Sequence, residues 1–224
     1  MNHSVLIFVA DIHLRPGNAK DAEIFIHWLK DAEQQASDIY ILGDLFDYWF
    51  TGVRNEMGGV LAALASDRIH LIPGNRDFLL ANARAGRVHI LKEEAVITSP
   101  TSTRLLLAHG HTLTRGDYGF KILHALGWPV LRLLDRCLRE DIKGCLARFL
   151  VRSSATVRTP RAVIDSDISR RRGVDTTVCG HLHRGLMSSE LIVLPAFFDT
   201  GQWLVWDSRG PRITGGGQHP FGEI

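Results

Sequence analysis

Few cysteines occur in the sequence, and this limits the kinds of site that it can build. The three are Cys137, Cys145 and Cys179, an odd number without the spacing of zinc or redox motifs. We therefore expect reduced, partly buried thiols in a cytoplasmic protein, and no structural zinc site built from thiolates. No signal peptide is evident, because the N-terminal apolar run is interrupted at Asp11.

Long apolar runs and a large excess of one charge are also absent. No stretch of the 224 residues is long and apolar enough to span a bilayer. The formal net charge of +2 argues against extensive nucleic-acid binding. Hydrophobic residues make up 45% of the chain, which suffices for a sizeable core, so one domain with a helical insertion is the simplest organisation.

Short apolar runs are the main structural signal in the chain. Runs of four to six apolar residues bounded by turn residues are typical of buried strands. They occupy 5–10, 39–42, 69–72 and 105–108, and further strands are expected at 175–179, 191–194 and 203–206. Apolar residues at helical spacing predict helices at 21–35 and 57–65. This alternation predicts an α/β fold, with a loose tail from residue 215 onward.

Seven residues that can bind a metal follow these runs, in islands about 30 residues apart, roughly the length of one βαβ unit. They are Asp11 and His13 in DIH, Asp44 in GDLFD, Asn75 in GNRD, His109 in HGH, and His181 and His183 in GHLH. Because loops just past buried strands are held by a rigid sheet, we expect these side chains to gather at one end of a sheet. Taken singly, Asp11 or Asp44 could instead cap a helix, and His109 could be a buried histidine with its hydrogen bonds satisfied.

The chemistry of these donors indicates a metal and a reaction. Carboxylate oxygens, imidazole nitrogens and one amide oxygen, with no thiolate, suit Mn²⁺, with Fe²⁺ or Zn²⁺ as alternatives. Seven donors exceed the need of one ion. Two divalent ions about 3.5–4 Å apart that share a carboxylate form a template for in-line attack on phosphorus. Hydrolysis of a phosphate ester or anhydride is therefore the leading hypothesis.

The order of the motifs D-x-H, GD-x-x-D, GN-x-D, H-G-H and GH-x-H resembles the calcineurin-like metallophosphoesterase superfamily. This resemblance runs from Asp11 to His183 and implies a four-layer α/β/β/α sandwich with a dinuclear metal site. Within the superfamily, GDLFDYWF and GNRDFLL resemble the UDP-2,3-diacylglucosamine pyrophosphatases of lipid A biosynthesis. The narrower resemblance implies cleavage of UDP-2,3-diacylglucosamine to lipid X and UMP, by a cytoplasmic enzyme in peripheral contact with the inner face of the membrane.

The resemblance also implies roles for individual residues. It assigns Asp11, His13, Asp44 and His183 to one metal, and Asp44, Asn75, His109 and His181 to the other, so that Asp44 bridges the two. The implied substrate contacts are Arg76, His111, Asp117, Phe120, Arg152 and Ser153. Two of these depart from the subfamily pattern, which usually has Asp in place of His111 and Tyr in place of Phe120. His111 could equally be a group that supports the metal ligands.

Arg76 follows Asn75, where many superfamily members carry a histidine that can protonate the leaving group. Arginine stays charged and cannot act as a general acid, but its guanidinium can bind phosphate oxygens and stabilise transition-state charge. Such a site suits a leaving group that departs without a proton, such as the phosphate monoester released from a pyrophosphate. Asn75, Arg76 and Asp77 are therefore the catalytic candidates, with Asp77 orienting a neighbour. A surface salt bridge between Arg76 and Asp77 is the alternative.

The segment from about 120 to 152 breaks the alternation of strands and helices. Apolar side chains fall on one helical stripe and cationic ones on another: Leu131, Leu134, Leu138, Ile142 and Cys145 against Arg132, Arg136, Arg139 and Lys143. We expect a cationic amphipathic helix, beginning or kinked near Pro129, within a lid insertion at about 118–165. Its apolar face could accept acyl chains and its arginines could meet anionic phosphates. Alternatively, the leucines pack on the domain and the arginines face solvent.

Three functions remain open at this point. The first is the lipid A pyrophosphatase that the resemblance implies. The second is a phosphoesterase for another substrate, such as a nucleotide or a phosphoprotein. The third is a noncatalytic metal-binding scaffold that presents its helical face to a partner.

Overall fold

The computed structural model describes residues 4–49, 56–82, 88–115, 128–139, 142–143, 163–165 and 167–216. Its helices are α1 (Ala19–Gln35), α2 (Gly58–Ala63), the 3₁₀ helix η2 (Phe78–Asn82), α4 (Trp128–Cys137), α6 (Ile168–Arg172) and α7 (Phe197–Thr200). Its strands are β1 (Leu6–Val9), β2 (Asp38–Leu42), β3 (Ile69–Ile72), β4 (His89–Ile90), β5 (Glu94–Thr98), β6 (Arg104–Ala108), β7 (Thr114–Arg115), β8 (Val163–Ile164), β9 (Thr176–Cys179), β10 (Leu186–Met187), β11 (Leu191–Val193), β12 (Gln202–Asp207) and β13 (Gly210–Gly215).

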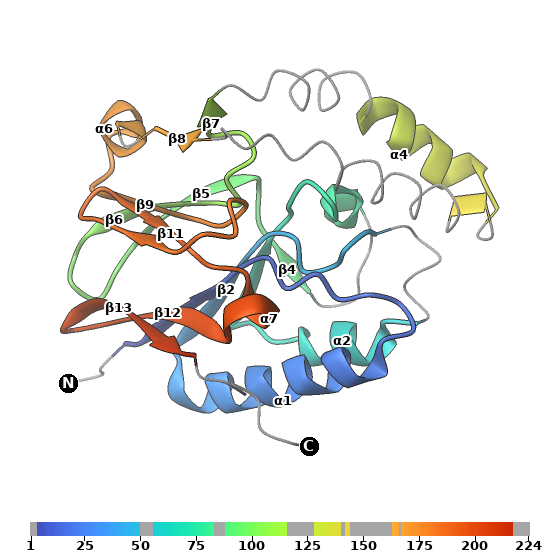
Figure 1. The fold of residues 1–224 in the computed structure, drawn as a ribbon, viewed down its shortest axis with the longest axis horizontal. Coiled ribbons are helices and arrows are strands. Elements are labelled where there is room, and N and C mark those ends of the chain that lie inside the picture. The colour runs from blue at the N-terminus through green and yellow to red at the C-terminus, as the bar shows by residue number, and fades with distance from the viewer. Residues whose placement is uncertain are drawn as a thin grey trace.

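Two main sheets organise these strands. A six-stranded sheet has the order β13-β12-β1-β2-β3-β4, in which β1 to β4 are parallel, β12 runs antiparallel to β1, and β13 runs antiparallel to β12. A five-stranded sheet has the order β10-β11-β9-β6-β5, with β11, β9 and β6 parallel at its centre. Helices α1 and α2 lie on the side of the six-stranded sheet away from the five-stranded sheet (Figure 1). The carboxyl ends of the parallel strands therefore meet at common sheet edges, where α/β proteins place their binding sites.

Alternate residues of the central strands pack into different apolar clusters. In β1, Ile7 and Val9 belong to a cluster that includes α1, whereas Leu6 and Phe8 belong to a second cluster shared with β6 and β9. Successive side chains of a strand point to opposite faces of the sheet, so both faces of β1 are buried. This explains why the strand reads as an uninterrupted apolar run and not as an alternation of apolar and polar residues.

The two-sheet α/β fold expected from the sequence is confirmed, while the four-layer sandwich stays a prediction. The strands expected at 39–42, 69–72 and 105–108 begin within one residue of the expected positions. Helix α1 begins two residues earlier than expected, at Ala19, because Asn18 caps it: its Oδ1 accepts a hydrogen bond of 3.3 Å from the Asp21 amide.

Only part of the expected amphipathic helix lies in the described residues. Helix α4 begins at Trp128 and ends at Cys137, and Leu131 packs against the cluster that includes α1. Beyond α4, the apolar Ile142 is 47% exposed, whereas Lys143 of the cationic stripe is buried with its Nζ 3.3 Å from Asp135 Oδ1, which does not fit a cationic stripe that faces solvent throughout. Among the described residues, no helix is both long enough and apolar enough to cross a bilayer.

Candidate metal centre

Loops at the ends of five strands carry the candidate ligands to one place. Asp11 and His13 follow β1, Asp44 follows β2, and Asn75 follows β3, all in the six-stranded sheet. His109 follows β6, and His181 and His183 follow β9, in the five-stranded sheet. The site thus lies where the carboxyl ends of the two sheets meet, and neither sheet supplies the whole donor set.

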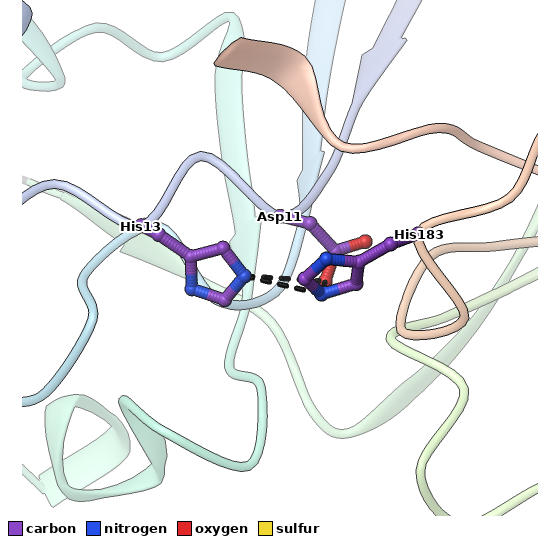
Figure 2. Close-up of side chains that lie close together, drawn as sticks. All are labelled: Asp11, His13 and His183. Atoms are coloured by element: carbon purple, nitrogen blue, oxygen red, sulfur yellow. Dashed lines mark hydrogen bonds and ion pairs between the residues drawn. The ribbon is translucent and has the colours of Figure 1, made fainter. Parts of the chain in front are cut away.

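Asp11, His13 and His183 form the first donor group. Asp11 Oδ1 lies 3.4 Å from His183 Nε2 and 4.0 Å from His13 Nε2, and the two Nε2 atoms are 3.2 Å apart. Figure 2 shows these side chains turned toward one another. Asp11 Oδ1 is buried and accepts no hydrogen bond from the described residues. A buried carboxylate oxygen beside two imidazole nitrogens is a good fit to a divalent cation.

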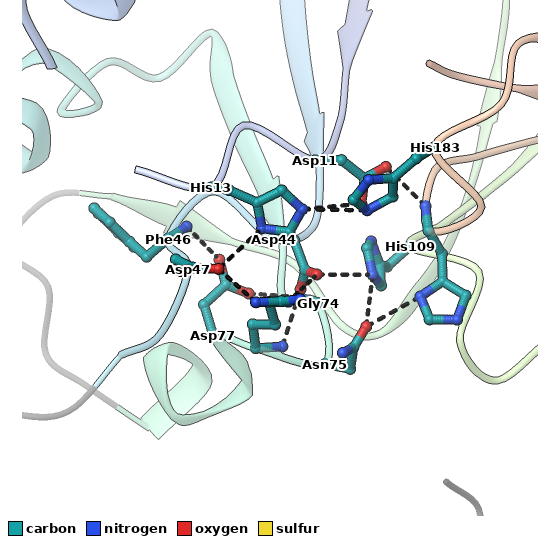
Figure 3. Close-up of polar contacts among 12 residues, drawn as sticks. Asp11, His13, Asp44, Phe46, Asp47, Gly74, Asn75, Asp77, His109 and His183 are labelled. Atoms are coloured by element: carbon teal, nitrogen blue, oxygen red, sulfur yellow. Dashed lines mark hydrogen bonds and ion pairs between the residues drawn. The ribbon is translucent and has the colours of Figure 1, made fainter. Parts of the chain in front are cut away.

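The second donor group surrounds Asp44 and Asn75 (Figure 3). His109 Nε2 lies 3.6 Å from Asp44 Oδ2 and 3.0 Å from Asn75 Oδ1. His181 Nδ1 is 3.1 Å from the same Asn75 oxygen. Asp11, Asp44 and His109 are also close enough to hold one ion together, so the two groups adjoin. This is the donor set that the resemblance divides between two metals.

Backbone groups orient the donor atoms of this centre. His181 N donates to Asp11 Oδ2 at 2.8 Å, and Arg76 N donates to Asp44 Oδ1 at 2.9 Å, which leaves the other oxygen of each carboxylate facing the donor groups. His109 Nδ1 lies 2.9 Å from the carbonyl oxygen of Leu42. A carbonyl can only accept, so Nδ1 carries the proton and Nε2 presents its lone pair to the site.

The electrostatics of the metal-free centre favour cations. Burial, together with His109, lowers the pKa of His181 to about 4, so His181 is neutral and able to bind a metal at neutral pH. Burial, together with the charge of Asp44, raises the pKa of Asp77 to about 7. Burial lowers the pKa of His109, but the nearby Asp44 and Asp11 carboxylates raise it more. A divalent cation would stabilise the carboxylates that burial disfavours.

Backbone strain is concentrated at the same residues. Six non-glycine residues of the described chain have φ in the left-handed region, and five of them are candidate ligands: Asp11, His13, Asp44, His181 and His183, with φ between 51° and 72°. Each such residue costs about 1 kcal/mol or more. Strain of this kind persists only where the surrounding structure enforces it, and it commonly marks functional sites.

Two glycines permit the close packing of these loops. Gly43 has φ +83°, and a Cβ placed there would lie 2.4 Å from the ring of His109. A Cβ on Gly74 would lie 2.1 Å from Asp44 Oδ1 and 2.4 Å from the Asp44 amide nitrogen. Glycine is therefore required in GD and GN because the neighbouring loop occupies the volume of a side chain.

Arg76 and Asp77 have separate partners. Arg76 forms an ion pair with Asp47 Oδ1 at 2.5 Å, and its Nε is 3.8 Å from Asp44 Oδ2. Asp77 is fully buried and accepts hydrogen bonds from the amides of Gly74 at 2.7 Å and Phe46 at 3.2 Å. Asp77 therefore joins the loop of Asn75 to the loop of Asp44, as a residue that orients its neighbours would.

The predicted substrate contacts are only partly described. His111 is 1% exposed, with its ring centroid 5.4 Å from that of His109 and 6.3 Å from that of His181. This position favours the alternative in which His111 supports the metal ligands. Asp117, Phe120, Arg152 and Ser153 lie outside the described residues.

Arg15 is a neighbour of the centre that was not predicted from the sequence. Its Nε donates a hydrogen bond of 2.9 Å to Asp47 Oδ2. The available signal was its position two residues after His13. Leu14, which lies between them, forms a β-bridge with Phe46, so His13 and Arg15 both lie along the loop after β2.

Comparison with known proteins identifies the family. Residues 5–185 match the family profile described as Calcineurin-like phosphoesterase. A UDP-2,3-diacylglucosamine hydrolase of Aromatoleum aromaticum is 31% identical over 239 aligned positions, which cover 92% of this chain and 95% of that protein. A UDP-2,3-diacylglucosamine hydrolase of Edwardsiella ictaluri is 30% identical, over 80% of this chain and 75% of that protein.

A solved structure agrees at the level of the fold. A dimetal phosphatase from Danio rerio superposes with a TM-score of 0.50 at 12% identity and covers 94% of this chain and 98% of that one. Family membership also explains the donor set, since these enzymes are hydrolases that depend on divalent metals. The chain belongs to the calcineurin-like phosphoesterase family and is a metal-dependent hydrolase.

Proposed function

We propose that the protein hydrolyses the diphosphate of UDP-2,3-diacylglucosamine, giving 2,3-diacylglucosamine 1-phosphate and UMP, with two Mn²⁺ ions. The observation that carries this proposal is the convergence of seven donors and one guanidinium on a single centre. The names of the relatives at 26–31% identity support the choice of substrate.

Each proposed ion has a donor group of its own. Asp11, His13 and His183 would hold one ion and Asn75, His109 and His181 the other, with Asp44 shared. Ions in such a site polarise phosphoryl oxygens and promote the ionisation of water. The pinned oxygens of Asp11 and Asp44 keep the donor geometry fixed, so the reacting groups need little reorganisation.

Arg76 is proposed to stabilise the developing charge on phosphorus. Its guanidinium lies beside Asp44 and is held by Asp47, so it faces the centre in a fixed orientation. A guanidinium keeps its protons at neutral pH and cannot act as a general acid, so the site suits a leaving group that needs no proton, such as a phosphate monoester. An alcohol that leaves as an alkoxide would instead need a general acid. The reaction proposed is therefore cleavage of an anhydride and not of a simple ester.

Helix α4 supplies an argument for an acylated substrate. Val130 is 54% exposed and Leu133 is 60% exposed, so this helix keeps apolar side chains in solvent. Exposed apolar side chains on a helix suit contact with acyl chains or a membrane surface. We propose that the enzyme meets its substrate at the cytoplasmic face of a membrane, with α4 as part of a lid.

A substrate panel tests this function. Purified protein would be assayed with Mn²⁺ and with a chelator, on UDP-2,3-diacylglucosamine and on UDP-N-acetylglucosamine, which lacks the two long acyl chains. We expect hydrolysis that requires Mn²⁺ and strongly favours the acylated substrate. Equal rates on the two would remove the lipid A assignment, and an absence of Mn²⁺-dependent turnover on these substrates and on an aryl phosphodiester would contradict the catalytic role.

A further inference from the structure

Arg15 lies beside the candidate metal centre without belonging to its donor set. Its side chain is 66% exposed, whereas its partner Asp47 is buried, with a side chain that is 5% exposed. Only Nε of Arg15 is engaged, by Asp47 Oδ2; within the described part of the chain, its terminal nitrogens take part in no hydrogen bond. A largely exposed guanidinium is thus held at a defined position with most of its donors available.

The backbone fixes the position of this pair. Leu14 N donates to the Leu45 carbonyl at 2.9 Å, and Asp47 N donates to the Leu14 carbonyl at 2.9 Å. The loop after β1 therefore runs alongside the loop after β2. Arg15 and Asp47 lie side by side because of this main-chain pairing and not only because their charges attract.

Asp47 holds two guanidinium groups and touches a candidate ligand. Its Oδ2 accepts from Arg15 and its Oδ1 pairs with Arg76. The same Oδ1 lies 3.7 Å from His13 Nδ1, on the side of the ring opposite the nitrogen that faces the centre. One carboxylate therefore aligns both arginines, and its single charge cannot neutralise both; the second carboxylate nearby, Asp44, lies beside Arg76 and forms no ion pair with Arg15 among the described residues.

The two arginines differ in their distance from the centre. Arg76 Nε is 3.8 Å from Asp44 Oδ2, at the heart of the donor set, and its side chain is only 18% exposed. Arg15 lies on the other side of the Asp47 carboxylate, and it is mostly in solvent. A ligand that carries one phosphoryl group on the metals can meet Arg76, whereas Arg15 suits a second anionic group farther out.

We infer that Arg15 is a second phosphate-binding residue, which selects ligands with two linked phosphoryl groups over ligands with one. Arg76 binds the phosphoryl group that is attacked, and Arg15 binds its neighbour. Asp47 is a positioning residue that spaces the two guanidinium groups. This inference deepens the proposed function and rests on its placement of the attacked phosphorus between Arg76 and the metal donors.

Binding measurements test the inference without relying on turnover. Isothermal titration calorimetry would measure binding of UDP and of UMP, which differ by one phosphoryl group, to the Mn²⁺-loaded protein at constant free Mn²⁺. We expect Arg15→Ala to weaken UDP binding about tenfold or more, since a charge-assisted hydrogen bond is worth about 1.5–3 kcal/mol. UMP binding should change less than twofold. Arg15→Lys should restore only part of the loss, because ammonium lacks the guanidinium fork.

Arg170→Ala is the matched control. Arg170 is also exposed and ion-paired, with Asp167 and Glu190, but it lies on α6, away from the centre. This variant should bind UDP and UMP as the wild type does. The inference would be overturned if Arg15→Ala left the ratio of UDP to UMP affinity unchanged, because both affinities stayed the same or fell equally. It would also be overturned if Arg170→Ala lost as much UDP affinity as Arg15→Ala.

The inference and the proposed function can fail separately. If Arg15→Ala loses the preference for UDP but the wild type does not hydrolyse UDP-2,3-diacylglucosamine, the second phosphate site stands and the substrate is a different diphosphate. If the wild type hydrolyses that substrate but Arg15→Ala keeps the preference for UDP, the function stands and the role of Arg15 is refuted. The role of Arg15 would also be refuted if the wild-type protein bound UDP no more tightly than UMP.

Discussion

Gly74 is the position where adding a single methyl group should disturb the metal centre most. A Cβ there would lie 2.1 Å from Asp44 Oδ1, 2.4 Å from Asp44 N and 2.9 Å from Asp44 Cγ. Contacts below 3.0 Å are not tolerated, so Asp44 or the Gly74 loop must move by about 1 Å. Because Asp44 Oδ1 also accepts the hydrogen bond from Arg76 N, this movement disturbs the orientation of the Asp44 carboxylate.

The expected size of the effect follows from that displacement. Overpacking of this kind costs about 1–3 kcal/mol of stability, which a folded domain of this size can tolerate. A misplacement of about 1 Å in a catalytic group can cost about 100-fold in rate. We therefore expect Gly74→Ala to fold and to lose about 100-fold in kcat/KM, measured with Mn²⁺ on an aryl phosphodiester, with urea unfolding as the measure of stability.

Gly58→Ala is the control for this substitution. Gly58 begins α2, and a Cβ there would meet no heavy atom within 4 Å. The change should leave activity intact and stabilise the protein by about 0.4–1 kcal/mol. Folded Gly74→Ala protein with activity within fivefold of wild type would refute the argument that the neighbouring loop excludes a side chain at Gly74.

Three further predictions concern Arg76, His181 and the cysteines. Arg76→His should lower kcat/KM for UDP-2,3-diacylglucosamine about 100-fold but slow an alkyl phosphodiester less, because histidine can donate a proton; equal losses would contradict the proposed role. The pKa of His181 falls from 6.5 to about 4 on folding, so the unfolded chain binds more protons between these values. Metal-free protein should therefore lose up to about 3 kcal/mol as the pH falls from 6.5 to 4, and His181→Gln should lose less in urea unfolding. Iodoacetamide should modify the exposed Cys137 and spare Cys179, whose thiol pKa burial raises, as peptide mass mapping would show.

Strands buried on both faces were predictable from the sequence, whereas edge strands were not. The runs that became β1, β2 and β6 are continuously apolar, and the run of β3 is interrupted only by His70, since both faces of these strands meet an apolar cluster. By contrast, β5 lies at the edge of its sheet with Val96 54% exposed, and β4 has only two residues. Short or half-exposed strands carry too little apolar pattern to be distinguished from loops.

Helix α4 and the residues after it show where helical periodicity fails as a guide. The apolar stripe expected from Leu131 to Ile142 extends beyond α4, which ends at Cys137, and Ile142 is 47% exposed whereas Lys143 is buried. Helix ends depend on capping and tertiary contacts, such as the pairing of Lys143 with Asp135, which a periodic pattern does not contain.

The sequence alone determined which residues could bind metals and that each follows a buried strand, because strand burial and side-chain chemistry are local properties of the chain. Only the tertiary structure decided that donors from two different sheets meet, that backbone amides pin one oxygen each of Asp11 and Asp44, and that Asp47 holds both Arg15 and Arg76. These contacts join residues from about 30 to 170 positions apart. Their geometry depends on how the two sheets pack and on the paths of the loops, which no local pattern specifies.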